Sequence, residues 1–200
     1  MRAPHAIPVY YDFASTVCYV AHRVMGRMQA DLDRLGLTLD WRPLDLTALT
    51  GWTRGTEVEG PRRTNALRVA SDLRVDVRMP RAWLDSRAAH AIALTLAGTA
   101  KEPAWRERVW SAVFEEGRDL DPGTLARLAD DLGLDLSLPP AAETLARLDA
   151  ATDAARDAGV TGAPTLMLDE WPCGGIQEER TMRSLLERFV RKKTRAGTRE

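Results

Sequence analysis

Cysteine and histidine are scarce in this chain of 200 residues. Only Cys18 and Cys173 are present, so the chain can form at most one disulfide and holds no Cys-x-x-Cys redox centre. Three histidines and two cysteines show no metal-ligand spacing, and we predict no metal site. The sequence also lacks a glycine-rich phosphate loop and a Gly-x-Ser-x-Gly nucleophile turn. The sequence therefore supports neither a Cys-x-x-Cys dithiol, a metal site nor a phosphate loop as the basis of its function.

An excess of one charge and long apolar runs are also missing. The net charge is −1, with 28 basic and 29 acidic residues, so electrostatics predict neither a nucleic-acid partner nor a membrane partner. No stretch reaches the roughly 18 uninterrupted apolar residues that a membrane span needs. Residues 1–5 lead directly into an apolar run, without the pattern of a secretory signal peptide. We therefore expect a cytoplasmic protein with one domain, or with one domain that carries an insertion.

The most informative stretch is residues 9–23. An apolar run with β propensity ends at Asp12, and a helical pattern begins at Ser15, with Cys18 three positions later. This pattern predicts a strand that leads into the N-terminus of a helix. The first backbone N–H groups of a helix have no partner within it, and the helix dipole is positive there, so a thiolate or another anion is stabilised. The stretch is therefore a candidate site for thiol chemistry.

Two segments resemble known thioredoxin-fold proteins. Asp-Phe-x-Ser-x-x-Cys-Tyr at residues 12–19 resembles the active-site turn of the DsbA-like family, and Gly-Val-Thr-Gly-Ala-Pro-Thr at residues 159–165 is similar to the segment that carries the family's cis-proline. The family includes dithiol oxidoreductases, kappa-class glutathione transferases and 2-hydroxychromene-2-carboxylate isomerases. The resemblance implies an α/β fold, namely a thioredoxin-like domain with an all-helical insertion between the second and third sheet strands.

The order of apolar patterns and breaking residues predicts the elements of this fold. Strands are expected at about residues 7–12, 37–44, 165–168 and 171–176. Helices are expected at about residues 16–35, 63–73, 85–96, 103–115, 122–132, 140–158 and 178–190, with a loop at 46–61 and a fraying basic tail at 191–200. We predict a thioredoxin-like domain at residues 1–54 and 156–200, and a helical insertion domain at 55–155.

Ser15 and Cys18 are the candidate catalytic residues. The resemblance places Ser15 where dithiol members have their attacking cysteine, and where the transferases and isomerases have a serine that is thought to hold the sulfur of glutathione. Without that role, Ser15 would only cap the helix. Cys18 stands at the place of the resolving cysteine, and is either a lone reactive thiol or inert packing. His22, four positions later, would tune Cys18 if protonated, or would lie exposed on the helix surface.

The resemblance also implies residues that bind a cofactor. Thr16 lies in the first helical turn. A cis bond before Pro164 would leave the backbone of Ala163 free to pair with that of a thiol compound, whereas an ordinary trans proline in a loop is the alternative. Gln177 belongs to the Gly-x-Gln string that opens the last helix in the family. The implied cofactor is glutathione or another small thiol.

Other positions depart from the family's pattern. The lysine and tyrosine that bind glutathione in the family have no clear counterpart; Arg62, Arg63 and Asn65 stand in that neighbourhood, and an arginine there can bind a carboxylate. The nearest equivalent of the family's Asp-Arg pair is Glu179-Arg180. Cys173 is predicted to be a packed or exposed free thiol rather than a resolving partner.

Three functions are compatible with these residues. The first is an enzyme in which Ser15 holds a small thiol, while the insertion forms an apolar pocket for a small-molecule electrophile that is isomerised or transferred. The second is a thiol-disulfide oxidoreductase that uses Cys18 as a monothiol, which predicts a lowered Cys18 pKa and fast alkylation. The third is a binding protein without catalysis, for which polar or occluded walls around Ser15 would be the sign. The sequence leaves a homodimer open.

Overall fold

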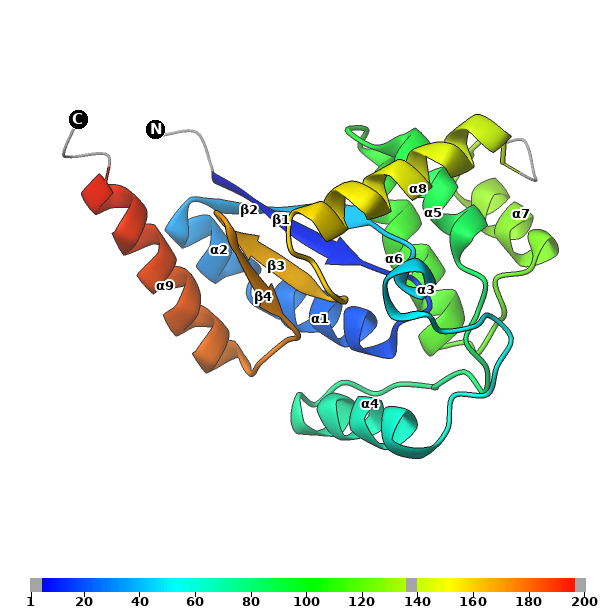
Figure 1. The fold of residues 1–200 in the computed structure, drawn as a ribbon, viewed down its shortest axis with the longest axis horizontal. Helices are drawn as coiled ribbons and strands as arrows, with labels where there is room; N and C mark the ends of the chain where they lie inside the picture. Colours follow the sequence, from blue (N-terminus) through cyan, green and yellow to red (C-terminus); the bar gives the residue numbers. More distant parts are fainter. Residues whose placement is uncertain (1–4, 136–139, 197–200) are drawn as a thin grey trace.

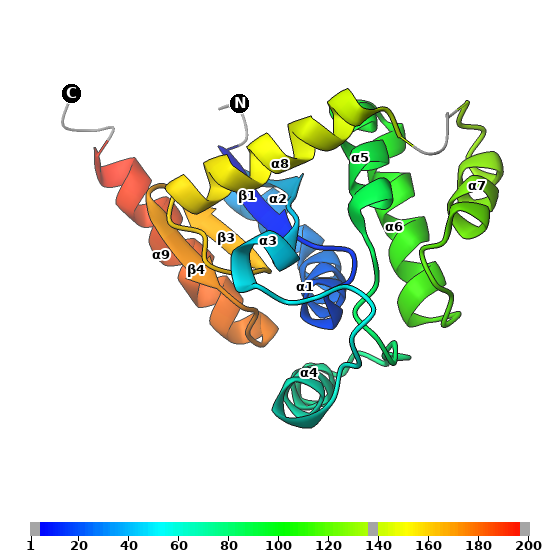
Figure 2. The same ribbon diagram turned by 45° about the vertical axis from the view of Figure 1, so that its right-hand side comes forward.

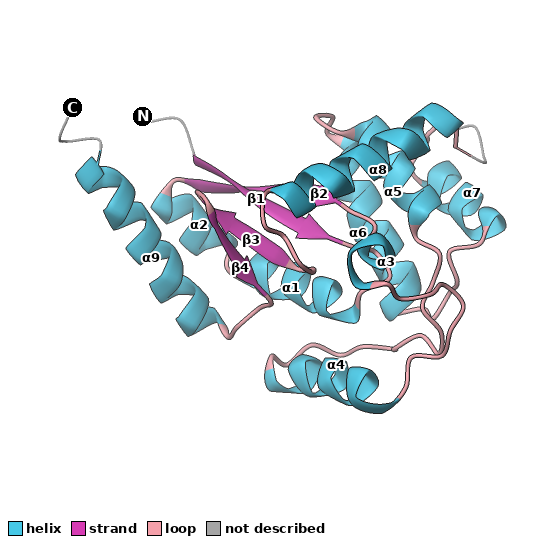
Figure 3. Ribbon diagram, viewed as in Figure 1, coloured by secondary structure: helices cyan, strands magenta, loops and turns pink. Residues whose placement is uncertain are grey.

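A four-stranded mixed sheet forms the centre of the described part of the chain, which comprises residues 5–135 and 140–196 of the computed structural model (Figures 1 and 3). Its strands are β1 (His5–Tyr11), β2 (Leu37–Pro43), β3 (Thr165–Leu168) and β4 (Trp171–Gly174). They lie in the order β2-β1-β3-β4. β1 and β2 are parallel, whereas β3 runs antiparallel to both β1 and β4. The carboxyl ends of β1, β2 and β4 therefore share one edge of the sheet.

Helices connect the strands and follow the last one. α1 (Thr16–Arg27) and α2 (Gln29–Leu35) lie between β1 and β2, and α9 (Glu179–Ala196) follows β4. The helices between β2 and β3 are α3 (Leu46–Thr50), α4 (Gly60–Asp72), α5 (Arg87–Leu96), α6 (Lys101–Phe114), α7 (Pro122–Asp131) and α8 (Ala142–Asp157). Figure 2 shows α8 on one side of the sheet, with α1 and α9 on the other. The sheet is thus the middle of three layers.

The local sequence explains several boundaries. Gly36 ends α2 in the left-handed conformation, with φ of 66°, which glycine adopts without strain. The Asp121 side chain accepts a hydrogen bond of 2.9 Å from the backbone N–H of Thr124, and Pro122 occupies the first turn of α7. Pro172 lies in β4, an edge strand, where a missing backbone donor is tolerated.

The expected order of strands and helices is confirmed, with three corrections. The helix expected at 16–35 is divided at Met28 into α1 and α2. Residues 46–50 form the short helix α3 inside the expected loop, because the Asp45 side chain accepts from Thr47 N and caps it. The last helix continues to Ala196, so the tail predicted to fray from residue 191 is helical over its described part. The last four residues of that tail, 197–200, lie outside the described residues.

The α/β architecture places helices α4 to α8 between β2 and β3, as the resemblance implied. α4 packs against α1, whereas α8 packs against α5, α3 and β2 (Figure 1). The division into two domains at residues 55 and 155 stays a prediction. No helix among the described residues is long and apolar enough to cross a membrane.

Candidate functional site

The N-terminus of α1 carries the first candidate residue. Ser15 is the N-cap, with φ of −86° and ψ of 113°, and its Oγ accepts a hydrogen bond of 3.3 Å from Cys18 N. Thr16 begins the helix and is buried. Ser15 itself is only 5% exposed. Its hydroxyl therefore lies at the positive end of the helix dipole, and little of it faces solvent.

The segment around Pro164 lies at the same edge of the sheet. The peptide bond between Ala163 and Pro164 is cis. Tyr10 pairs with Thr165 across the antiparallel β1–β3 ladder, so the next step of this register places Pro164 beside the last residue of β1. Ala163 is half-buried and packs against the core. The segment is thus adjacent to the turn that leads from β1 into α1.

Gln177 follows β4 at this edge and is exposed. Two residues earlier, Gly175 N donates a hydrogen bond of 2.8 Å to Pro164 O, which ties this loop to the proline segment. The next helix, α9, starts beside the C-terminal end of α1, where Arg27 Nε and Glu179 Oε1 are 2.7 Å apart. The structure therefore joins Gln177 to the Pro164 segment, whereas Glu179 belongs to the far end of α1.

Asp12 organises the turn between β1 and α1. Its side chain is fully buried, and its Oδ1 accepts hydrogen bonds of 2.8 Å from Ala14 N and 2.7 Å from Ser86 Oγ. Its Oδ2 accepts one of 2.8 Å from Leu46 N. Asp12 thus fixes the turn, the start of α3 and the residue before α5 to one another. A buried carboxylate needs such partners, because burial without them is costly.

His90 completes this arrangement from α5. Its ring is fully buried and stacks on Phe13, with centroids 4.8 Å apart and an interplanar angle of 22°. Its Nε2 lies 3.3 Å from Phe13 N and 3.2 Å from Asp12 Oδ1. The sequence showed Asp12 only as the first residue of the segment 12–19 that resembles the family, and it did not single out Ser86 or His90 as site residues. No spacing along the chain predicts that they meet.

Cys18 lies behind the turn rather than at a surface. The side chain is fully buried, and Asp12 N donates to its Sγ at 3.5 Å. Burial raises the pKa of the Cys18 thiol to about 12, against weaker opposing hydrogen bonds from Ser15 and Asp12. A monothiol mechanism predicts the opposite direction. Cys173 is half-buried and, like Cys18, is a free thiol.

His22 is neither exposed nor placed to tune Cys18. Its Nε2 lies 2.6 Å from Glu107 Oε2, and its ring packs on Trp110 with centroids 4.7 Å apart. Burial lowers the pKa of His22, although the Glu107 carboxylate opposes the shift. The neutral ring therefore donates its Nε2–H to Glu107 at pH 7. The expectation of a surface imidazole is wrong.

The basic residues of α4 are engaged within the chain. The Arg62 guanidinium lies 3.8 Å from the centroid of the Trp52 ring, which is a cation–π contact. Arg63 Nη1 donates to Pro80 O at 3.4 Å, and Asn65 Oδ1 accepts from Arg68 at 3.0 Å. The two arginine contacts tie α4 to Trp52 and to Pro80, whereas the Asn65 contact lies within α4. The suggested role of the arginines as carboxylate ligands therefore has no direct support in the structure.

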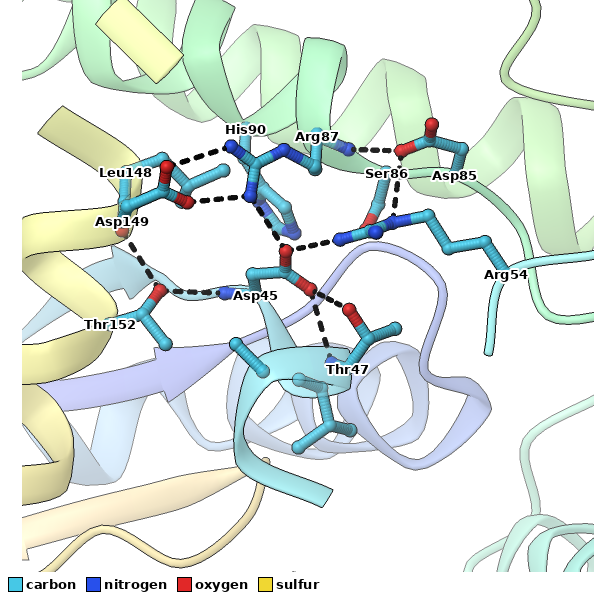
Figure 4. A network of polar contacts seen from close by, with 12 residues as sticks. Asp45, Thr47, Arg54, Asp85, Ser86, Arg87, His90, Leu148, Asp149 and Thr152 are labelled. Carbon is cyan, nitrogen blue, oxygen red and sulfur yellow. Dashed lines mark hydrogen bonds and ion pairs between the residues drawn. The ribbon is translucent and has the colours of Figure 1, made fainter. Parts of the chain in front are cut away.

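An ion network lies next to the turn (Figure 4). Asp45 is 3% exposed in its side chain and lies between the guanidinium groups of Arg54 and Arg87. Arg87 also makes two bonds, of 2.6 and 3.0 Å, to the Asp149 carboxylate on α8. Asp45 N donates to Thr152 Oγ1 at 3.0 Å. The network joins the residues after β2 to both α5 and α8, and sequence patterns gave no indication of it.

Among the residues that the structure describes, no group of three or more His, Cys, Asp or Glu side chains could hold a metal ion. The described site consists of a capping hydroxyl, a cis-proline segment and a buried polar cluster behind them.

These features define a thioredoxin-like fold with a helix N-terminus at the edge of the sheet where β1 ends. The model of the DSBA-like thioredoxin domain matches residues 6–187, and the chain therefore belongs to that family. A search of curated proteins finds no match to the sequence.

Solved structures show the same architecture. A 2-hydroxychromene-2-carboxylate isomerase is similar with a TM-score of 0.74 and 23% identity, over 96% of this chain and 98% of that chain. A putative protein disulfide isomerase from Nitrosomonas europaea is similar with a TM-score of 0.69 and 16% identity, over 94% and 98%. Cytosolic disulfide reductase DsbM from Pseudomonas aeruginosa, in a structure with GSH, has a TM-score of 0.61 and 21% identity, over 93% and 99%. At these identities the similarity establishes the shared fold alone.

Proposed function

We propose that this protein is an enzyme that uses glutathione or another small thiol to isomerise a small molecule or to transfer the thiol to it. The observation that carries the proposal is the position of Ser15, whose hydroxyl caps α1 at the edge of the sheet where the Ala163–Pro164 segment also lies. A hydroxyl accepts and donates at the same time, so Ser15 can accept from Cys18 N and donate to a bound sulfur. The helix N-terminus then favours the thiolate over the thiol.

In this proposal, different residues of the chain bind the sulfur and the backbone of the thiol compound. Ser15 and the N–H groups of the first helical turn, which includes Thr16, hold the sulfur. The backbone of Ala163 pairs with the backbone of the thiol compound, and Gln177 lies on the loop bonded to Pro164. The thiolate adds to an electrophilic carbon of a double bond and forms a C–S bond, while the π electron pair of that double bond moves to the neighbouring atom. In an isomerisation the same bond breaks again after the product geometry is set, and in a transfer another group leaves instead.

A binding protein without catalysis is the second candidate, and the 5% exposure of Ser15 favours it. A thiol reaches this hydroxyl only if the residues around it move. The monothiol alternative is weaker, because Cys18 is fully buried and its pKa is raised to about 12.

Titration with glutathione separates these candidates. We expect bound glutathione to raise the thermal midpoint. We also expect the thiolate absorbance, near about 240 nm in ultraviolet difference spectra, to increase in proportion to the fraction of protein that has glutathione bound. The Ser15→Ala variant should lose the absorbance change, whereas Ser184→Ala, on the exposed surface of α9, should keep it. Binding without thiolate formation would favour the binding protein. Binding unaffected by Ser15→Ala would overturn the proposal.

The compartment and the partners are also proposals. We propose that the protein is located in the cytoplasm, because the structurally similar disulfide reductase DsbM is described as cytosolic. A small molecule is the proposed substrate, and sedimentation of the purified chain tests whether it forms a homodimer.

A further inference from the structure

The turn at residues 12–15 has a hydrogen-bond acceptor for each of its four backbone N–H groups. In chain order, these groups donate to Cys18 Sγ at 3.5 Å, His90 Nε2 at 3.3 Å, Asp12 Oδ1 at 2.8 Å and Asp12 O at 3.1 Å. Three of the four acceptors belong to the turn or to the first turn of α1. His90 is the acceptor from another part of the chain, 77 positions from its donor.

The polar contacts of the His90 ring are all with this turn. Its Nε2 lies 3.3 Å from Phe13 N and 3.2 Å from Asp12 Oδ1, whereas its buried Nδ1 has no hydrogen-bond partner among the described residues. A ring nitrogen carries either a proton, which it can donate to Asp12, or a lone pair, with which it accepts from Phe13. In both cases the contact fixes one of the first two residues of the turn that ends at Ser15.

The start of α5 holds the turn through two side chains. Ser86 Oγ donates to Asp12 Oδ1 at 2.7 Å, and Ser86 O accepts from His90 N at 3.0 Å, so these residues are one helical turn apart on one face of α5. The His90 ring is fully buried and stacks on Phe13 with centroids 4.8 Å apart. Because close-packed interiors transmit displacements, the position of α5 is passed on to the turn.

The charge of Asp12 makes this contact relevant to thiol chemistry. Its carboxylate is buried three residues before Ser15, and a negative charge there opposes a second negative charge at Ser15. The other titratable groups near Asp12 are Cys18 of α1 and Tyr11 of β1, and burial raises the pKa of both, so both are neutral at pH 7. Among these described groups, His90 is the one that can supply a proton or a positive charge to Asp12.

We propose that His90 is a positioning residue for Ser15. Through Phe13 and Asp12 it holds the turn so that a thiol at the Ser15 hydroxyl meets the first N–H groups of α1 and ionises. That this thiol belongs to a bound cofactor rests on the proposed function. The role of His90 is tested with a thiol of the chain itself, so the two proposals can fail separately.

The test uses Ser15→Cys, combined with Cys173→Ser and kept reduced, to place a reporter thiol at position 15. Ultraviolet thiolate absorbance measured against pH gives the pKa of this reporter, and Cys18 does not interfere because burial raises its pKa to about 12. His90→Phe, added to this background, keeps a stacked ring but removes both nitrogens. It should raise the pKa of the reporter by about one unit, which lowers the ratio of thiolate to thiol about tenfold.

Two further variants separate positioning from a merely structural role. His90→Gln has an amide oxygen for Phe13 N and an amide N–H for Asp12, and should return the reporter pKa to the value measured with His90. Leu96→Ala, at the buried last residue of α5, should lower the thermal midpoint without moving the reporter pKa. Circular dichroism confirms that each variant is folded. If His90→Phe does not fold, His90→Asn replaces it, because the shorter amide does not reach the turn.

The outcomes distinguish this inference from the proposed function. A reporter pKa that is unchanged in the His90 variants, or that moves as far in Leu96→Ala, would overturn the role of His90, even if glutathione gives a thiolate signal with the original chain. A reporter pKa that rises in His90→Phe and returns in His90→Gln would support that role. The same result without any glutathione signal would overturn the proposed function alone.

Discussion

Ser86 Oγ donates a hydrogen bond of 2.7 Å to Asp12 Oδ1, although the two residues are 74 positions apart. Asp12 follows β1 directly, in the turn that leads into α1, and Ser86 precedes α5. The same carboxylate accepts from the backbone N–H of Leu46, the first residue of α3. The turn next to Ser15 is therefore held by contacts from outside its own strand and helix, and its shape depends on the helices inserted between β2 and β3.

Asp12→Asn should destabilise the protein by roughly 2–4 kcal/mol, because an amide places a donor against one of the groups that now donate to the carboxylate. Ser86→Ala should cost only about 1 kcal/mol, since Asp12 keeps its bonds from Ala14 and Leu46. Urea unfolding of both variants measures the difference. Equal losses of unfolding free energy in the two variants would mean that the Asp12 carboxylate stabilises the fold no more than its single hydrogen bond from Ser86 does.

Cys18 should react slowly with iodoacetamide. A pKa raised from 9.0 to about 12 reduces the thiolate fraction at neutral pH about a thousandfold, and burial further limits access. The measurement uses the Cys173→Ser variant, in which Cys18 is the remaining cysteine, and follows alkylation by mass spectrometry. Alkylation as fast as that of a free model thiol would restore the monothiol hypothesis.

His22 should contribute to loss of stability in mild acid. Its pKa in the folded protein is lowered by burial, so the unfolded chain binds more protons as the pH falls below about 6.5, and the folded state loses stability there. His22→Gln keeps a donor for Glu107 without this titration. Its thermal midpoint should fall less between pH 7.5 and pH 5.5 than that of the original chain. An identical fall would show that His22 is not the group responsible.

The network in Figure 4 allows a comparison of two carboxylates that bind the same arginine. Asp45→Ala should cost about 3 kcal/mol, because it removes the cap of α3 and leaves Arg54 and Arg87 without a buried partner. Asp149 is 55% exposed in its side chain, so Asp149→Ala should cost less than about 1 kcal/mol. Thermal unfolding of both variants measures this order, and the reverse order would contradict it.

Much of the fold was predictable because its signals are local. The helix start at Ser15, the glycine that ends α2 and the apolar run of β3 each depend on a few neighbouring residues. The break at Met28 and the helix α3 were missed. α1 and α2 share a continuous apolar period, and the Asp45 cap stands in a segment rich in turn-forming residues.

The candidate site was predictable only in part. Ser15 and Pro164 were found through their resemblance to the family. Asp12, Ser86 and His90 come from separate elements, and their contacts depend on how α5 packs against the turn. Burial is also a property of the whole fold. The sequence could therefore leave open whether Cys18 is reactive or inert, whereas the structure gives the direction of its pKa.

Gly26→Ala should stabilise the protein by about 0.5–1 kcal/mol. Gly26 lies inside α1, and a Cβ built on it meets no atom within 4 Å, so alanine gains helix propensity without a clash. Gly36→Ala is the matched control: its φ of 66° is strained for alanine, and we expect a loss of about 1 kcal/mol. Urea unfolding measures the change in stability of both variants.

Because Gly26 is near the end of α1 opposite Ser15, thiol binding should not change in the stabilised Gly26→Ala variant. A destabilised Gly26→Ala variant would show that the break between α1 and α2 requires glycine at this position.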